Sequence, residues 1–229
     1  DGTIVDANTA YGCRRASTAM HKQVAADHGF TSIAPVDILD EDGDISLPVV
    51  GGSNLTEDLV GANFQNYDLH IVLSHFKGHA RGGFGGAVKN MSIGYASSRG
   101  KTLIHSAGNS TTSWSGGTQD QFLESMAEAA KAVADDAGQN ILYISVMNHL
   151  SVDCDCDSNP AAPTMADIGI LASLDPVALD KACVDLVYAA EDGADLIERM
   201  ESRNGSHTLD HAGEIGLGSL AYELVSLDD

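Results

Sequence analysis

A long stretch without any Asp or Glu, residues 69–119, lies inside a chain of 229 residues whose formal net charge is −21. Burial of the stretch would exclude Lys and Arg as well as acids, so burial alone does not explain the pattern. Positive charge concentrated at one place in a negative protein attracts anionic ligands, and we therefore predict a site for a small anionic molecule here. The stretch holds five of the twelve basic residues and four of the nine histidines: Lys77, Arg81, Lys89, Arg99, Lys101, His70, His75, His79 and His105.

The overall composition excludes several classes of partner. The chain has 33 Asp and Glu against 12 Lys and Arg, and a surface this negative repels phosphate backbones and anionic lipids. We therefore expect no nucleic acid and no membrane as partners, and the sequence has no run of about 18 apolar residues that could span a bilayer. Hydrophobic residues make up 43% of the chain, which is enough to build a core. The acidic composition also fits a protein from a salty cytoplasm.

Cysteine usage points to a reducing compartment. Four cysteines in 229 residues are too few for a scaffold built on disulfides, so we expect a cytoplasmic protein. The chain begins at Asp1 with neither Met nor a basic and apolar leader, and we expect a processed or truncated piece without a signal peptide.

The periodicity of apolar residues predicts alternating helices and strands. This alternation favours an α/β layered fold with a mostly parallel central sheet and helices on both faces. We expect a single α/β domain over residues 1–229, with a weak internal boundary near residues 51–53. The predicted helices cover residues 14–28, 119–137 and a segment that opens at Asp175-Pro176, and the predicted strands cover residues 69–73, 141–147, 168–172 and 222–227.

Two histidines and a lysine follow the predicted strand at residues 69–73. In an extended chain His75, Lys77 and His79 point to one side, because side chains alternate along a strand. Ligands of open α/β sheets bind at the carboxyl ends of strands. We therefore expect Lys77 and His79 to act in catalysis and His75 to help hold a metal, whereas the alternative is a loop with two surface histidines.

A glycine-rich segment comes next. Successive glycine N–H groups can form a concave anion nest, and the residues after them can start a helix whose amino end favours negative charge. The segment lacks the Gly-Lys-Ser/Thr of a P-loop and the last glycine of a dinucleotide fingerprint. The glycines can equally serve tight backbone packing. The residues predicted to bind the anion are Gly82, Gly83, Gly85, Gly86, Lys89, Asn90 and Lys101.

A Cys-Asp-Cys block follows the predicted strand at residues 141–147. Cys154 and Cys156 share one face of an extended chain, and two thiolates on one face suit zinc, iron or an iron–sulfur cluster. A closed site needs four ligands, so neighbouring carboxylates or histidines must complete it. Of the other thiols, Cys183 is expected in the core and Cys13 stays undecided. A redox-active cysteine pair and a purely structural role remain open as alternatives.

These motifs also occur together in a known family. Residues 74–79, 83–90, 154–156, 167–173 and 175–180, with residues 6–12 near the start and 216–218 near the end, make the chain resemble the domain-of-unknown-function 362 family, often described as iron–sulfur centre proteins. The resemblance covers nearly the whole chain and implies a cluster cofactor and a redox protein partner. Many members carry a ferredoxin-like insert before the long helix, but residues 106–119 contain no cysteine, which disfavours the cluster. Members also have a strand-containing stretch ahead of residue 1, so the resemblance implies that part of the first layer is missing.

Together these features predict one cleft at the strand ends. A transition metal ion, zinc or iron, would lie beside a small anionic ligand, with His79, His105 and Lys77 as catalytic candidates. Whether the protein is an enzyme stays open: a metal-dependent binding or electron-delivery module with a redox protein partner, and a phosphate-ligand enzyme without metal, are the alternatives. The predicted metal ligands are Cys154, Cys156, Asp153, Asp155, His75 and His149.

Overall fold

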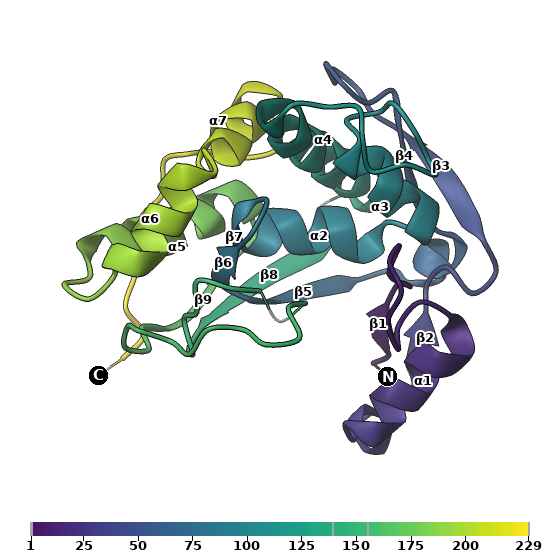
Figure 1. The fold of residues 1–229 in the computed structure, drawn as a ribbon, viewed down its shortest axis with the longest axis horizontal. Coiled ribbons are helices and arrows are strands. Elements are labelled where there is room, and N and C mark those ends of the chain that lie inside the picture. The colour runs from purple at the N-terminus through teal and green to yellow at the C-terminus, as the bar shows by residue number, and fades with distance from the viewer. Residues whose placement is uncertain (1, 139, 155, 229) are drawn as a thin grey trace.

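The computed structural model describes residues 2–138, 140–154 and 156–228, and Figure 1 shows its mixed helix and strand architecture. The helices are α1 (Thr18–Asp27), α2 (Ala87–Tyr95), α3 (Ser98–His105), α4 (Gln119–Ala137), α5 (Pro176–Ala189), α6 (Ala194–Ser202) and α7 (His207–Glu214). The strands are β1 (Ile4–Asp6), β2 (Val36–Ile38), β3 (Asp44–Pro48), β4 (Glu57–Gly61), β5 (His70–His75), β6 (Lys77–His79), β7 (Gly83–Gly85), β8 (Ile141–Met147) and β9 (Gly169–Ser173).

The central sheet has three strands in the order β5-β8-β9. β5 and β8 are parallel, as expected for strands joined through helices, but β9 runs antiparallel to β8. The segment between β8 and β9 forms no helix in its described part, so the chain re-enters the sheet from the end at which it left, and that return gives an antiparallel pair. The structure therefore shows a mixed sheet and not the mostly parallel sheet that the sequence predicts.

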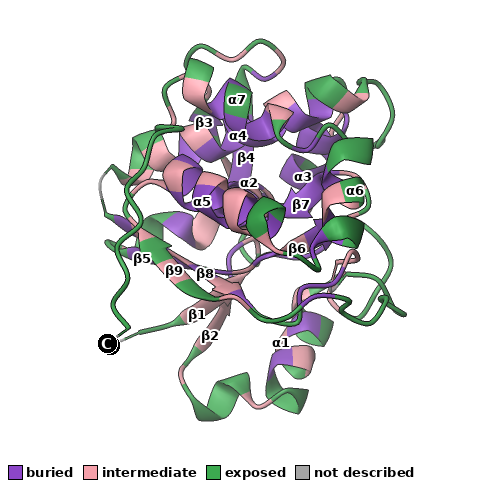
Figure 2. Cartoon of the chain, turned by 90° about the vertical axis from the view of Figure 1, so that its left-hand side faces the viewer, coloured by how far each residue is buried: buried purple, intermediate pink, exposed green. Residues whose placement is uncertain are grey.

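Helices cover one face of this sheet. α2 and α5 contact β5, β8 and β9 from the same side, and Figure 1 shows the remaining C-terminal helices above them. On β5, Val72 points into the core, whereas Ile71 and Leu73 are 58% and 62% exposed on the other side. Figure 2 shows the same contrast between the buried helical layer and the green outer residues. The expectation of helices on both faces is thus wrong for the described part of the chain.

All three predicted helices and three of the four predicted strands lie close to their expected positions. α4 has the predicted bounds because Thr118 and Gln121 form a capping box at its start. α5 begins after Asp175, whose carboxylate accepts hydrogen bonds from the Val177 and Ala178 amides. β8 also has the predicted bounds, whereas residues 222–227 form no strand.

The smaller sheets pack around this centre. β1 and β2 pair in parallel across α1, while β3 with β4 and β6 with β7 form antiparallel hairpins. The segment near residues 51–53, predicted as a weak boundary, is tied to α4: the buried Glu128 carboxylate accepts from the Ser53, Asn54 and Leu55 amides. Among the described helices, none is long and apolar enough to cross a membrane.

Candidate metal centre and its surroundings

Three potential metal ligands meet beyond the carboxyl ends of β5 and β8. One ligand atom each from His79, Cys154 and Cys156 lies within 4.8 Å of the other two, and they form the only such group of three or more in the described residues. His79 ends β6, while the two cysteines lie in the long segment between β8 and β9. Cys154 is half-buried and Cys156 is exposed, so the group opens to solvent through Cys156.

The chain holds the cysteine segment against β6 by close backbone contact. The Gly78 amide donates to the Ser151 carbonyl at 2.8 Å. A Cβ on Gly78 would lie 2.2 Å from the Val152 carbonyl oxygen, so only glycine allows this approach. On the far side, the Arg199 guanidinium of α6 donates to the same Val152 oxygen at 2.7 Å. These contacts fix Cys154, two residues further on, next to His79.

The pKa values of the two thiols are shifted in opposite directions. Hydrogen bonds from the Cys156 thiol and from His79, with the positive charge of Lys89, lower the pKa of Cys154 despite its burial. The pKa of Cys156 is raised, because its proton is held by Cys154 and its own ionisation would place two negative sulfurs side by side. The shifts oppose each other because the two thiols share a hydrogen bond, and Cys154 is the thiol of the pair that ionises first.

Backbone amides fix the orientation of the His79 ring. Its Nδ1 accepts from the Gly82 amide at 2.9 Å and from the Arg81 amide at 3.2 Å. Because two N–H donors face Nδ1, the proton of the neutral ring belongs on Nε2, which is the nitrogen left to face Cys154. Burial lowers the pKa of His79, so the ring is neutral.

Cationic side chains surround this group. Lys89 of α2 acts electrostatically on both thiols and on His79, and Lys77 acts on His79. The Arg81 guanidinium lies 4.4 Å above the Phe122 ring, and its pKa is lowered by burial alone. The sequence stretch without acids thus supplies the positive charge next to the cysteines, as its composition suggests.

His105 lies in the same neighbourhood but in a buried position. Its Nδ1 donates to the Lys101 carbonyl at 2.6 Å, and its ring stacks on Phe122 at 4.9 Å between centroids. Burial lowers the pKa of His105 to about 3, and the charges of Arg81 and Lys89 act in the same direction. A ring with this pKa is a weak base at neutral pH, so its predicted role as a proton carrier stays a prediction.

The amides that follow the glycine-rich segment are engaged by the carboxyl group of Asp180, whose pKa burial raises to about 7. The fully buried Asp180 carboxylate accepts from the Ala87 amide at 2.7 Å and from the Val88 amide at 2.9 Å, at the start of α2. Gly83 and Gly85 belong to β7 and pair with β6, and the Gly82 amide donates to His79. The Gly82, Ala87 and Val88 amides are thus engaged within the chain, and binding of an external anion by Gly82, Gly83, Gly85 and Gly86 stays a prediction.

Three predicted metal ligands lie outside the cysteine group. Asp153 pairs with Arg199 at 3.1 Å and accepts from the Ala161 amide at 3.0 Å. His75, which donates to the Asn148 carbonyl at 2.6 Å, and His149 line a separate hollow of 390 Å³ on the open side of the sheet. Asp155 lies outside the described residues.

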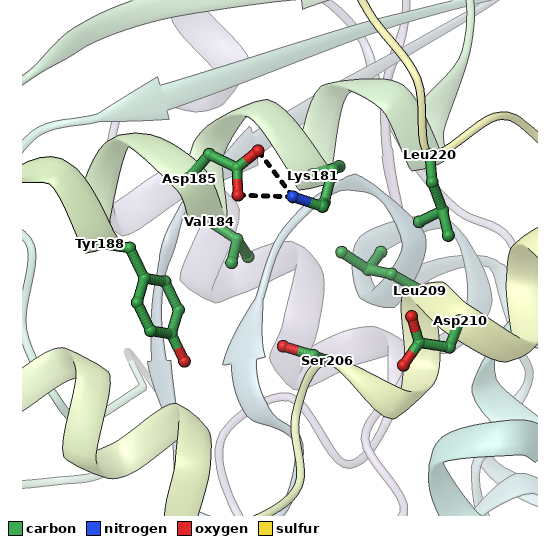
Figure 3. Close-up of a pocket in the computed structure, with 8 residues that line it drawn as sticks. All are labelled: Lys181, Val184, Asp185, Tyr188, Ser206, Leu209, Asp210 and Leu220. Carbon is green, nitrogen blue, oxygen red and sulfur yellow. Dashed lines mark hydrogen bonds and ion pairs between the residues drawn. The ribbon is translucent and has the colours of Figure 1, made fainter.

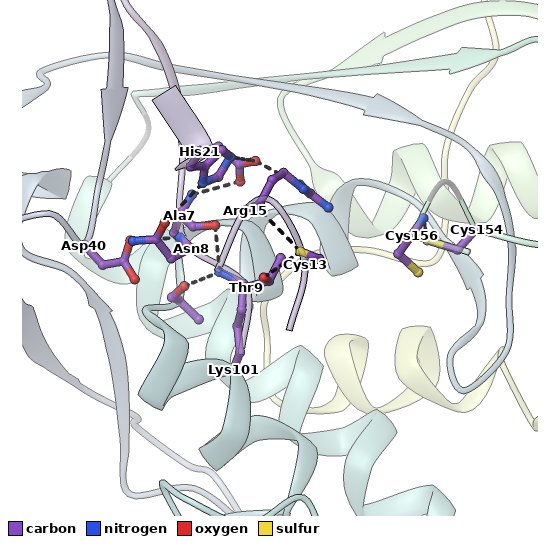
Figure 4. A network of polar contacts seen from close by, with 12 residues as sticks. Ala7, Asn8, Thr9, Cys13, Arg15, His21, Asp40, Lys101, Cys154 and Cys156 are labelled. Atoms are coloured by element: carbon purple, nitrogen blue, oxygen red, sulfur yellow. Dashed lines mark hydrogen bonds and ion pairs between the residues drawn. The ribbon is translucent and has the colours of Figure 1, made fainter. Parts of the chain in front are cut away.

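Two predicted anion ligands serve internal contacts. Lys101 is buried and donates from Nζ to the Ala96 carbonyl at 2.6 Å and to the Ala7 carbonyl at 3.4 Å. Burial lowers its pKa to about 8. Figure 4 shows Lys101 beneath the segment that carries Thr9 and Cys13, with Cys154 and Cys156 to one side. Asn90 donates to the Leu73 carbonyl at 3.0 Å and so joins α2 to β5.

Two exposed aromatic residues near the cysteines are absent from the predicted site. Tyr11 comes from the segment after β1 and Trp114 from the segment after α3, and their ring centroids lie 6.5 Å apart. The Tyr11 phenol is within electrostatic range of Cys156, Cys13 and Cys154. An aromatic residue in a loop of Gly, Ser and Thr has no core to fill, and this was the available sequence signal for Trp114.

A further hollow, of 230 Å³, lies between α5, α7 and the C-terminal segment (Figure 3). Its Lys181 ammonium pairs with both Asp185 oxygens at 2.5 and 2.6 Å. None of the predicted site residues lines this hollow, so it is not the candidate site.

Comparison with protein families gives one assignment. The model for a domain of unknown function (DUF362) matches residues 1–185 of the chain. That range includes β1 to β9, the three residues of the candidate metal centre and most of α5. A comparison with curated proteins gives no match.

Proposed function

The chain belongs to the DUF362 family, and from its Cys/His group we propose that it binds a transition metal ion, zinc or iron, next to a small anionic ligand. The observation that carries the proposal is the approach of three ligand atoms to within 4.8 Å of one another. Sulfur and imidazole donors suit zinc and iron better than magnesium or calcium, which prefer oxygen.

The donor set fits an open site. Two sulfurs and one imidazole are fewer than the four ligands of a closed structural site, and an open position is typical of catalytic metals. A metal in such a site supplies a Lewis acid for a substrate oxygen or a centre for electron transfer. A four-cysteine cluster is disfavoured, because Cys183 is buried on α5 and is not part of the group.

The sulfurs would be the principal ligands. Cys154 is the thiol with the lowered pKa, and metal binding would displace the proton between Cys154 and Cys156. His79 fits less simply, because its Nδ1 lone pair is taken by two amides. Nε2 can therefore donate to the Cys154 sulfur. To bind the metal through Nε2, the ring would have to become an imidazolate, or move its proton to Nδ1 and give up the two amide contacts.

An anionic ligand is supported by the charge around the group. Arg81 donates a long hydrogen bond to the His105 carbonyl, and the positive charges of Arg81 and Lys89 both act on the His105 ring. An anion here would neutralise charge that is partly desolvated, which strengthens the attraction relative to water. His79, whose Nε2 carries the proton of the neutral ring, would then be the candidate for holding or donating a proton at that atom.

Elemental analysis tests the metal. We expect about one equivalent of zinc or iron in the purified protein, and a loss of most of it in the double variant Cys154→Ser with Cys156→Ser. Cys13→Ser is the matched control, since it removes an exposed thiol outside the group and should keep the metal. Equal metal content in wild type and double variant, with both folded by circular dichroism, would remove the thiolate site.

A further inference from the structure

A surface of aromatic rings leads from solvent to the cationic side of the candidate metal centre. Tyr11 and Trp114 are 42% and 37% exposed, and their planes are inclined by 51°. Trp114 contacts the His105 ring edge-to-face at 4.3 Å between centroids. His105 in turn stacks on Phe122, above which the Arg81 guanidinium lies. Through Trp114, the exposed pair therefore contacts the aromatic cluster of His105 and Phe122 on which Arg81 packs.

Both ends of this surface lie within reach of the metal ligands. Electrostatic coupling places the Tyr11 phenol near Cys154 and Cys156, and it places His105 near His79, Lys89 and Arg81. Tyr11 and Trp114 come from segments about a hundred residues apart, so the fold, and not a local motif, brings them together.

The guanidinium of Arg81 is the second observation. It is half-buried over Phe122, and its one polar contact within the described residues is a long hydrogen bond of 3.5 Å to the His105 carbonyl. Burial is the sole cause of its lowered pKa. Within the described residues no carboxylate is paired with it. A half-buried cation without an anionic partner is unfavourable unless a ligand supplies one.

We propose that the ligand of this site is a planar aromatic anion, stacked on the Tyr11–Trp114 pair with its charged group toward Arg81. This identification rests on the proposed function, because it names the class of the small anion next to the metal. Stacking on aromatic side chains is tolerant of ring type, whereas the guanidinium requires negative charge. Nucleotides and aromatic carboxylates share this chemistry.

Four probes separate the contribution of a planar ring system from that of negative charge. Flavin mononucleotide and adenosine monophosphate carry both, riboflavin carries only the plane, and inorganic phosphate carries only the charge. Trp114 is the one tryptophan of the chain, so its fluorescence reports binding at this surface directly. Titrations in about 0.15 M salt, where surface attraction is partly screened, should show quenching by at least one of the two charged planar probes. We expect that probe to bind at least tenfold more tightly than riboflavin or phosphate.

Variants then test the residues by calorimetry. Tyr11→Ala and Trp114→Ala should each weaken the binding of the charged planar probe by roughly tenfold or more. Arg81→Met should also weaken the binding of that probe, while the affinity for riboflavin stays unchanged. Tyr188→Ala is the control, because Tyr188 is equally exposed at 43% but lies on α5 next to the other hollow. Unchanged thermal midpoints show that the variants fold.

The outcomes separate this inference from the metal proposal. No binding of either charged planar probe, equal binding of phosphate, or an unchanged affinity in Tyr11→Ala would each overturn the planar-anion class, whatever the metal content. If planar probes bind as expected while the double cysteine variant keeps its metal, the thiolate site fails and the aromatic surface stands.

Discussion

At the scale of single residues, Gly86 is required by a carboxylate from a distant helix. A Cβ at this position would lie 2.3 Å from Asp180 Oδ1, which accepts the Ala87 amide at 2.7 Å. Gly86→Ala must displace the buried carboxylate from the start of α2. We expect the free energy of unfolding to fall by about 2–4 kcal/mol, through overpacking and lost buried hydrogen bonds, as measured by urea denaturation.

Gly12→Ala is the matched control for this substitution. A Cβ on Gly12 meets no atom within 4 Å, so we expect a change within about 0.5 kcal/mol. If both alanine variants unfold at the same urea concentration, Asp180 does not hold the start of α2 as described.

The Gly86 contact shows what single-residue patterns can and cannot predict. The glycine run correctly predicts a turn into a helix, but the amides at the start of that helix contact a carboxyl group of the chain itself and not the external anion that the run predicts. That carboxyl group belongs to Asp180, 93 residues from Ala87, and no local pattern encodes such a pairing. The same holds for His79, whose amide contacts are local but whose cysteine partners come from beyond β8.

At the scale of elements, one face of β5 packs against helices and the other face is exposed to solvent. Val72 is 5% exposed toward the helices, and its neighbour Leu73 is 62% exposed on the other side. Val72→Ala should lower the free energy of unfolding by about 2 kcal/mol, because it leaves a cavity in the core. Leu73→Ala should change it by less than about 0.5 kcal/mol. Comparable losses in urea denaturation would mean that another layer covers the outer face in solution.

Elements with local start signals were predictable, and their pairing was not. α4 and α5 carry caps and apolar stripes, and β8 is β-branched and aromatic, so each has nearly the predicted bounds. The direction of β9 depends on the long cysteine segment before it, whose course the sequence does not show. Residues 222–227 have strand-like composition, but Tyr222 bonds to Asp185 of α5 and the segment joins no sheet.

At the scale of the whole molecule, the distribution of charge along the sequence was a better guide to which segments come together than the predicted order and direction of the strands. The cationic stretch and the Cys-Asp-Cys block do come together, since Lys89 acts on both thiols. Long side chains placed in the same sequence stretch nevertheless have different roles: Lys101 points inward to backbone carbonyls and His75 lies on the open sheet side. Composition places charge in a region, whereas packing decides which of the charged groups faces the ligand.

The net charge of −21 predicts that the stability of the whole molecule depends on salt. The reason is that repulsion among the carboxylates opposes the compact state. Salt shortens the screening length from about 10 Å at 0.1 M to about 3 Å at 1 M. We therefore expect the thermal midpoint to rise by several degrees over this range, because about 1 kcal/mol corresponds to about 2–4 °C in a chain of this size. NaCl and KCl should act equally if screening is the cause. A midpoint that stays constant or falls would show that the acidic groups are spaced or paired well enough that their repulsion does not limit stability.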